Sequence, residues 1–246
     1  MSEALIHASA VVLGRLGGEN VRVGALACIG AGALVEDGVE IGDGALVGPD
    51  VHVGARARIM PGAVVTGDVP RNAVVSGHPA VIVGYVDAPA SSVASLAAVA
   101  GPPGPQASRV RGVQLHTLRE VADMRGFLCA AEVGGALTFT PRRCFWVYNV
   151  PNQQVRGEHA HRRCAQLLTA ITGQLRVVVD DGVQREEFWL DRPNLSLYLP
   201  PLTWGIQYGY SSDAVLMVLA SDPYDPEDYI RDYGEFQRLV HAEEHT

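Results

Sequence analysis

A strict six-residue period runs through the first third of the chain. From Val23 to Val65 an aliphatic residue recurs at every sixth position, and a small or aliphatic residue follows each of them four positions later. Helices repeat every 3.6 residues and strands every two, so neither explains the spacing. Period six predicts a parallel β-helix, in which each hexapeptide forms one side of a triangular coil and the aliphatic residues fill its centre. The repeating residues are Val23, Ile29, Val35, Ile41, Val47, Val53, Ile59 and Val65, each followed by Ala27, Ala33, Val39, Ala45, Val51, Ala57, Ala63 or Val69.

The same register continues backwards through Leu5 and Val11 and is interrupted at Gly17-Gly18. We therefore expect a short β-helix from about residue 5 to about residue 70, which is just under four coils. Including the residues that close it, the first domain is predicted to span residues 1–86.

The end of this repeat resembles the closing turns of the left-handed β-helix hexapeptide acyltransferases. The resemblance lies in the stretch from Pro61 to Pro70 and in Gly77-His78-Pro79-Ala80. It implies a left-handed coil, and acetyl-CoA as a possible cofactor of this domain. Those enzymes use a histidine as base, and for each candidate a surface or packing role is the stronger interpretation. The domain is thus either a sugar N-acyltransferase or a reduced assembly module, and the candidate bases are His7, His52 and His78.

Residues 87–108 have the composition of a linker. They contain one charged residue before Ser108, among Ala, Ser, Pro and Gly, and include the run Gly101-Pro102-Pro103-Gly104-Pro105. Such a composition favours an extended tether over a packed element. A second domain is therefore predicted for residues 109–246.

The second domain reads as short strands separated by turns. At least seven strands in a domain of this length predict a closed or nearly closed antiparallel barrel. Asp180-Asp181-Gly182 is typical of a hairpin turn. A terminal helix is expected to open at Pro226, with Tyr229, Tyr233, Phe236 and Val240 on one face. The expected strands are 144–148, 166–172, 175–180, 184–190, 195–199, 203–208 and 214–220.

Two histidines flank one alanine at His159-Ala160-His161. In an extended segment alternate side chains share a face, so both imidazoles are expected to enter one pocket. Histidine titrates near neutrality, and a convergent pair can remove a proton at one atom of a substrate and return one at another. A metal site is the rival interpretation, because His-x-His is a frequent ligand spacing.

The segment from His159 through Gln166 to Gly173 resembles the first motif of the cupin barrels. In metal-binding cupins a glutamate ligand normally stands at the position of Gln166, and a further histidine is expected where this chain has the stretch from Leu199 to Trp204. Two neutral donors without a carboxylate hold a divalent ion poorly, so we expect a site without a metal.

Five motifs in the same order resemble the sugar nucleotide 3,4-ketoisomerases, over about residues 110 to 240. The resemblance implies a metal-free cupin that converts dTDP-4-keto-6-deoxyglucose into its 3-keto isomer, with no cofactor. The alternatives are a cupin similar to the 3,5-epimerases, a metal-dependent oxygenase, and a non-catalytic sugar-binding or assembly protein. The motifs are the segments 143–148, 156–161, 179–182, 186–191 and 228–233.

Under this hypothesis His159 is the base and His161 is the acid or an orienting donor. Arg143 and Arg156 are expected to pair with the diphosphate, since guanidinium groups bind phosphate oxygens bidentately. The aromatic candidates for stacking on thymine or sugar are Trp189, Trp204 and Tyr208. Tyr148 and Gln166 complete the expected substrate-binding set.

The formal charge of −8 argues against a nucleic acid polymer as partner, because no basic stripe is present to neutralise phosphates. No membrane-spanning stretch and no basic signal-peptide start are found, and the four cysteines form no C-x-x-C pair, so a cytoplasmic protein is expected. A homo-oligomer is predicted: the resemblances imply a trimeric β-helix and a dimeric cupin, which together can close as a hexamer.

Overall fold

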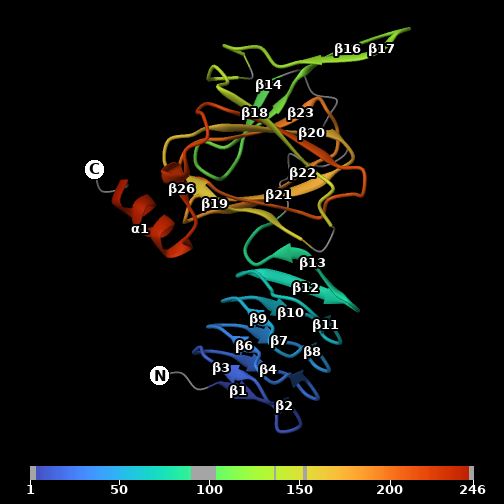
Figure 1. The fold of residues 1–246 in the computed structure, drawn as a ribbon, viewed down its shortest axis with the longest axis vertical. Coiled ribbons are helices and arrows are strands. Elements are labelled where there is room, and N and C mark those ends of the chain that lie inside the picture. The colour runs from blue at the N-terminus through green and yellow to red at the C-terminus, as the bar shows by residue number, and fades with distance from the viewer. Residues whose placement is uncertain (1–3, 90–103, 136, 152–153, 244–246) are drawn as a thin grey trace. The chain divides into compact units, whose positions relative to one another are not determined.

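The structure is a computed structural model that describes residues 4–89, 104–135, 137–151 and 154–243 (Figure 1). The chain divides into two compact units, Met1–Asp87 and Ala88–Thr246, and each is described by itself. Most of the expected linker lies outside the described residues. Its end differs from the prediction, because β14 (Gly104–Ala107) pairs with β15 (Gln114–Thr117) as an edge strand of the second unit. Within the described part of the chain, no helix is long and apolar enough to cross a membrane.

The first unit is a stack of coils built from two-residue parallel strands, shown in blue to teal in Figure 1. In each strand after the first coil the second residue faces inward and is at most 3% exposed from Val23 to Val65. The period-six prediction of an aliphatic column inside a parallel β-helix is confirmed. The three faces are β1 (Leu5–Ile6), β4 (Arg22–Val23), β7 (Glu40–Ile41) and β10 (Arg58–Ile59); β2 (Val11–Val12), β5 (Cys28–Ile29), β8 (Leu46–Val47) and β11 (Val64–Val65); and β3 (Arg15–Leu16), β6 (Leu34–Val35) and β9 (His52–Val53).

The register of the first coil differs from the prediction by one residue. Leu5 lies opposite the outward-facing Arg22, and Val11 opposite Cys28. Ile6 and Val12, rather than Leu5 and Val11, therefore take the inward positions. A coil that is one residue shorter places every alternate side chain on the other face, and the sequence period does not reveal that shortening.

The stack also extends beyond residue 70. β12 (Ala73–Gly77) lies on β10 in parallel and pairs with β13 (Ala80–Tyr85) in an antiparallel hairpin. This hairpin closes the end of the β-helix, because its last strand covers backbone groups that the final coil would otherwise leave unpaired.

The second unit is a barrel of two antiparallel sheets. All seven strands expected from the sequence are present, with bounds within one residue of the prediction. The six-stranded sheet has the order β14-β15-β23-β20-β25-β18, and the five-stranded sheet has the order β22-β21-β24-β19-β26. The residue ranges of the other strands in these sheets are β18 (Arg143–Tyr148), β19 (Arg156–His161), β20 (Gln166–Thr172), β21 (Leu175–Asp180), β22 (Arg185–Leu190), β23 (Leu195–Leu199), β24 (Trp204–Tyr208), β25 (Val215–Ala220) and β26 (Tyr229–Ile230).

The sheets face each other across an apolar core that includes Leu168, Val177, Phe188 and Leu197. A separate hairpin, β16 (Arg119–Asp123) with β17 (Gly126–Ala130), projects from the barrel (Figure 1).

The terminal helix begins later than predicted. A 3-10 turn at Pro226–Asp228 is followed by strand β26, and α1 spans Tyr233–Glu243. β26 pairs with β19, so Tyr229 lies in a strand beside the histidines and not on the helix. The turn forms because the Asp228 carboxylate accepts hydrogen bonds from His161 and from the backbone of Arg163, which draws the segment onto the sheet.

Candidate active site

A bulge in β19 decides which of its side chains face the interior of the barrel. Arg156 lies opposite Gln207 and His159 opposite Gly205, with an extra residue between them. Gly157 has φ 84° and Glu158 has φ 52°, the left-handed values that such a bulge requires. Arg156 and His159 are three residues apart, so strict alternation would place them on opposite faces. The bulge brings both into the same cavity.

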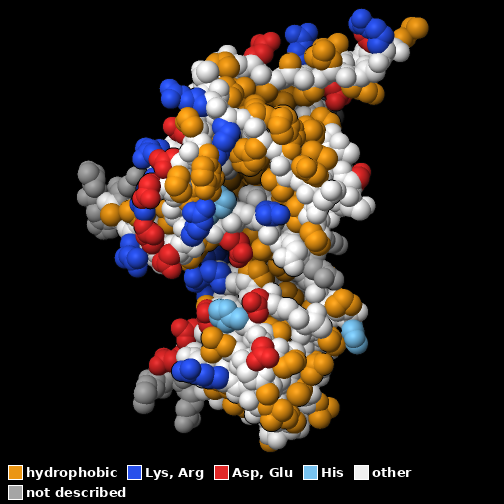
Figure 2. Space-filling view, viewed as in Figure 1, with side chains coloured by type: hydrophobic (Ala, Val, Ile, Leu, Met, Phe, Trp, Pro, Cys, Tyr) orange, Lys and Arg blue, Asp and Glu red, His pale blue; other side chains and the backbone are white. Residues whose placement is uncertain are grey.

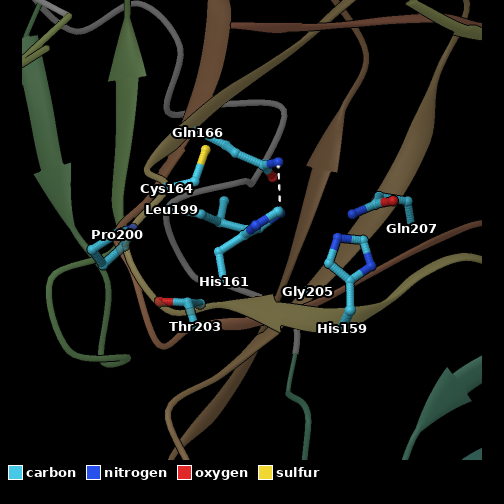
Figure 3. A pocket seen from close by; sticks show the side chains of 9 residues that line it. All are labelled: His159, His161, Cys164, Gln166, Leu199, Pro200, Thr203, Gly205 and Gln207. Carbon is cyan, nitrogen blue, oxygen red and sulfur yellow. Dashed lines mark hydrogen bonds between the residues drawn. The ribbon is translucent and has the colours of Figure 1, made fainter. Parts of the chain in front are cut away.

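The two imidazoles lie edge to face, with ring centroids 5.0 Å apart and planes at 83°. Both line a small enclosed space together with Cys164 and Gln166 (Figure 3). In that view His159 lies beside Gln207, whereas His161 points to Gln166. The two rings thus share one region but have different neighbours.

Within the part of the chain that the structure describes, His159 has a hydrogen-bond partner at one ring nitrogen and none at the other. Its Nδ1–H donates a hydrogen bond of 2.8 Å to the carbonyl of Gly157, so Nε2 carries the free lone pair. Burial, with smaller contributions from His161 and Arg231, lowers the pKa of His159 to about 4, and the bond to Gly157 only partly offsets this. At neutral pH His159 is therefore an uncharged imidazole able to accept a proton at Nε2.

His161 has partners at both ring nitrogens. Nδ1–H donates to the Asp228 carboxylate at 2.8 Å, and the Gln166 amide lies 3.1 Å from Nε2, where it donates. Burial lowers the pKa of His161, against the opposing effect of Asp228. Burial raises the pKa of Asp228, but the hydrogen bonds from His161 and the Arg163 backbone outweigh it and the pKa is lowered. His161 is a neutral, fixed neighbour of His159.

Strand β26 and the residue that follows it supply two side chains that the sequence analysis did not assign to the site. The Tyr229 ring lies 4.4 Å from that of His161 and 4.9 Å from that of His159, measured between centroids. The guanidinium of Arg231 stacks on Tyr229 at 4.4 Å. The motif at 228–233 was recognised in the sequence. Because it was expected on a helix, Tyr229 and Arg231 were not predicted to lie beside the two histidines.

A second cavity of about 380 Å³ opens beside His159. Within the described residues, neither Arg156 nor Arg231 forms an ion pair with a carboxylate. Two uncompensated guanidinium groups favour a ligand with negative charge, such as a diphosphate. The lining residues are Phe145, Val147, Val155, Arg156, Gly157, His159, Gln166, Leu168, Gln207, Leu216, Val218, Tyr229 and Arg231.

The three expected stacking aromatics lie outside this cavity. Trp204 packs edge-on against Tyr233, with centroids 5.1 Å apart, and Tyr208 donates its hydroxyl to Glu187. Trp189 lies under the guanidinium of Arg176 on the same outer face. Alternation along β24 turns its even-numbered residues away from the facing sheet, so Gln207 takes the interior place instead. Gln207 was missed because two aromatic residues of the same strand, Trp204 and Tyr208, drew the assignment.

Tyr148 and Arg143 also differ from the expectation. Tyr148 is 61% exposed, because Phe145 and Val147 are the residues of β18 that face inward. Arg143 does not line the cavity; its guanidinium lies 4.9 Å from the centroid of Phe145. It is near enough to His161 to contribute to the lowering of that pKa.

Three residues could in principle hold a metal ion: the ligand atoms of His161, Cys164 and Asp228 lie within 4.8 Å of one another. The Asp228 oxygens, however, already accept hydrogen bonds from His161 and from the backbones of Arg163 and Cys164, at 2.8, 2.8 and 3.3 Å. Those donors occupy the lone pairs that a metal would need. The cluster is therefore suited to orienting His161 through hydrogen bonds, not to holding an ion.

Two facing antiparallel sheets with a histidine-lined cavity between them define a cupin-type barrel. The family model described as WxcM-like, C-terminal, matches residues 111–241 of the 246. The chain belongs to this family. Residues 32–67 match the bacterial transferase hexapeptide repeats.

The relatives are similar to the second unit. A TDP-4-oxo-6-deoxy-α-D-glucose-3,4-oxoisomerase of Aneurinibacillus thermoaerophilus is 38% identical over 122 residues, which is 50% of this chain and 88% of that protein. A 3,4-ketoisomerase from Helicobacter canadensis is 34% identical, with TM-score 0.51 over 53% of this chain and 98% of its own. A histidine-to-asparagine mutant of a 3,4-ketoisomerase from Thermoanaerobacterium thermosaccharolyticum, solved with TDP-4-keto-6-deoxyglucose, is 27% identical, with TM-score 0.53 over 54% and 96%. The resemblance expected from the five motifs is confirmed.

Proposed function

We propose that this chain is an isomerase that converts dTDP-4-keto-6-deoxyglucose into a dTDP-3-keto-6-deoxyhexose in deoxysugar biosynthesis. The observation that carries the proposal is the open Nε2 of an uncharged His159 in the wall of a cavity that also holds Arg156 and Arg231. The named activities of the relatives support it. In this assignment the two arginines bind the diphosphate, while Gln166 and Gln207 orient the sugar oxygens.

The reaction needs a base and hydrogen-bond donors, but no redox cofactor. The proton at C3 is acidic because the neighbouring C4 carbonyl takes up the electron pair as an enediolate. Amide donors stabilise that anion. We infer that Gln166 and Gln207 have this role, because both line the cavity beside His159.

The direct test is to incubate the protein with dTDP-4-keto-6-deoxyglucose and follow the sugar by NMR. Formation of a 3-keto sugar in which C4 has gained a hydrogen supports the proposal. An epimerase would instead exchange the hydrogens at C3 and C5 with solvent and leave the carbonyl at C4. A sugar-binding protein without activity would shift the resonances without any exchange.

The low pKa of His159 predicts an unusual pH profile. We expect kcat/KM to stay constant from pH 8 downwards and to fall only as pH passes through about 4, when Nε2 becomes protonated. Because the pKa of His159 is lower in the folded than in the unfolded chain, the unfolded chain binds a proton at higher pH. The free energy of unfolding is therefore also expected to fall as pH drops from about 6.5 toward 4. Initial rates at subsaturating substrate concentration, measured as a function of pH, give this acidic fall in kcat/KM. An apparent pKa near 6.5 would contradict the buried, uncharged His159.

Isomerase activity is expected to survive exhaustive chelation, because Gln166 replaces the usual carboxylate and Asp228 is engaged by backbone donors. Metal analysis of the protein and activity after dialysis against EDTA measure this. One equivalent of bound transition metal, with activity lost on its removal, would contradict the prediction. Dialysis without chelator is the control.

For the first unit we propose an assembly role. Its face formed by β2, β5, β8 and β11 carries the outward side chains Val11, Cys28, Leu46 and Val64, which are all apolar. Figure 2 shows hydrophobic side chains gathered over these coils. An apolar flat face of this kind supports packing against other copies, as a trimer would provide. An acetyl-CoA-dependent acyltransferase stays the alternative, with the exposed pair of His52 and Glu36, 2.7 Å apart, as the place for its base.

For the second unit we propose dimerisation through uncovered apolar side chains. The hairpin of β16 and β17 exposes Val121, Phe127 and Leu128, and the edge strand β18 exposes Trp146. Unpaired edges and exposed aromatic residues favour pairing with another chain.

A threefold and a twofold contact predict a hexamer in solution. Deleting residues 1–103, which spares strand β14, is expected to leave an active dimer, because the relatives consist almost entirely of the part that remains. Light scattering on both proteins measures the masses. A full-length protein with the mass of a simple dimer would contradict the trimeric contact.

A further inference from the structure

One corner of the β-helix is occupied by Leu26, Gly44 and Gly62, which are eighteen positions apart in successive coils. Each of them stands two residues before a strand of the face formed by β5, β8 and β11. All three have left-handed backbone angles, with φ of 58°, 64° and 70°. Glycine adopts this conformation at no steric cost, whereas the Cβ of leucine disfavours it. Leu26 is therefore strained at a corner where the repeat otherwise has glycine.

A side chain at this corner points away from its own coil. A Cβ built on Gly44 or on Gly62 would meet nothing within 4 Å. Leu26 agrees with this geometry, because the residue is 73% exposed. Its backbone N–H donates a hydrogen bond of 3.0 Å to Oγ of Ser9, which fixes the corner without covering the leucine side chain. Leu26 thus combines backbone strain with a largely solvent-exposed apolar side chain.

This combination calls for a stabilising contact outside the coil. Strained backbone conformations persist where other interactions stabilise them, and they gather at sites of binding or function. Gly44 and Gly62 show that the corner forms without a side chain, so the coil itself does not require leucine. Removing the Leu26 side chain from water against another molecule would offset the strain.

The surface that Leu26 borders indicates the partner. On the adjoining face the outward residues are Val11, Cys28, Leu46 and Val64, none of which is charged, and Val11 and Leu46 are 51% and 41% exposed. A partner that covers this face and its corner must itself be apolar there, and the same surface of a second copy meets that condition. The other two faces point charged or titratable residues outward, which are Arg22, Glu40 and Arg58 on one and Arg15 and His52 on the other.

We propose, on the basis of the assembly role proposed above for the first unit, that Leu26 is the anchor of the contact between copies of this chain. Its side chain is buried against a neighbouring copy, and this burial offsets the cost of the left-handed backbone. In a threefold ring each copy supplies one such leucine, so three equivalent contacts form when the ring closes. This explains why leucine occupies a corner at which the next two coils have glycine.

The test is Leu26→Gly in the full-length protein, with mass measured by light scattering over a range of concentrations. Glycine suits the corner, so the variant is expected to fold, which circular dichroism and thermal melting check. We expect the hexamer of the variant to dissociate to the dimer held by the second unit. The concentration at which this happens should rise by at least about 10-fold over the wild type, because each contact loses a buried leucine.

Asn20→Gly is the matched control. Asn20 is exposed and has φ 59°, but it lies at a different corner, before β4. This substitution is expected to leave the mass and the dissociation concentration unchanged. Leu26→Asn is a second variant, since asparagine tolerates the left-handed conformation but is polar, and it is expected to weaken the assembly as glycine does.

Cys28 gives an independent measure of the contact. It lies two residues from Leu26, on the apolar face. Maleimide labelling followed by mass spectrometry of peptides measures how fast this thiol reacts. We expect slow labelling of Cys28 in the wild type and faster labelling in Leu26→Gly at the same concentration.

The outcomes separate the anchor role from the assembly role. A wild-type protein with the mass of a simple dimer would overturn the assembly role of the first unit. A wild-type hexamer whose Leu26→Gly variant keeps the same dissociation concentration and the same Cys28 labelling would overturn only the anchor role of Leu26. Equal dissociation of Asn20→Gly and Leu26→Gly would also overturn it, because the effect would then belong to the corner conformation and not to the leucine side chain.

Discussion

Replacing His159 by asparagine is expected to lower kcat for isomerisation by about 10²- to 10⁴-fold, the usual contribution of one positioned general base. Asparagine is similar in size and can still donate to the Gly157 carbonyl, which His159 Nδ1 contacts at 2.8 Å. It has no basic nitrogen to accept the proton from C3. The loss is therefore expected in turnover, with KM changed much less, because the arginines that face the diphosphate are untouched.

The matched control is His52→Asn, which replaces an exposed histidine of the first unit that pairs with Glu36. This variant is expected to isomerise at the wild-type rate. Circular dichroism and thermal melting of both proteins separate a lost base from a lost fold. A His159→Asn protein that melts normally and turns over like the wild type would refute the assignment of His159.

The second large effect is expected for Gly157→Ala. A Cβ at this position would lie 2.5 Å from the backbone oxygen of Gly205, and the residue has φ 84°. Backbone strain and overpacking each cost about 1–3 kcal/mol, so a clear fall in melting temperature is expected. The bulge would also have to shift, which moves Arg156 and His159 relative to each other. A displacement of about 1 Å in a catalytic group can lower the rate by about 10²-fold.

Gly134→Ala provides the control for this variant. Gly134 has φ 87°, almost the same value, but a Cβ there meets nothing within 4 Å. It is expected to show the strain in its melting temperature without loss of activity. Equal effects of the two substitutions on stability and rate would mean that the close approach to Gly205 has no influence on the site.

The two architectures and most of the strand positions follow from the amino-acid sequence alone. The aliphatic column of the β-helix follows from a six-residue period, because only one backbone geometry buries every sixth side chain. In the barrel, β20, β21 and β23 lie where alternation and turn residues placed them. The motif of His159 and His161 also marked the region of the candidate site, because residues two positions apart in a strand share a face.

Which face of each strand points inward depends on how the strands pair in the folded protein. A one-residue difference, in the first coil or in the bulge at Gly157, reverses which side chains point inward. Trp204 and Gln207 show the consequence: the tryptophan packs against Tyr233 of the helix, and the glutamine lines the cavity. Local sequence does not reveal such shifts, because the partner strand and the bulge set the register.

The place of the segment from Asp228 to Arg231 was likewise a tertiary outcome. Its aromatic spacing favoured a helix, yet its residues form a 3-10 turn and a two-residue strand beside β19. The hydrogen bonds of the Asp228 carboxylate to His161 and to the Arg163 backbone stabilise this arrangement, and these residues lie more than sixty positions earlier in the chain. These hydrogen bonds between residues far apart in the sequence outweigh the local preference for a helix. A pattern of neighbouring residues does not reveal such long-range partners.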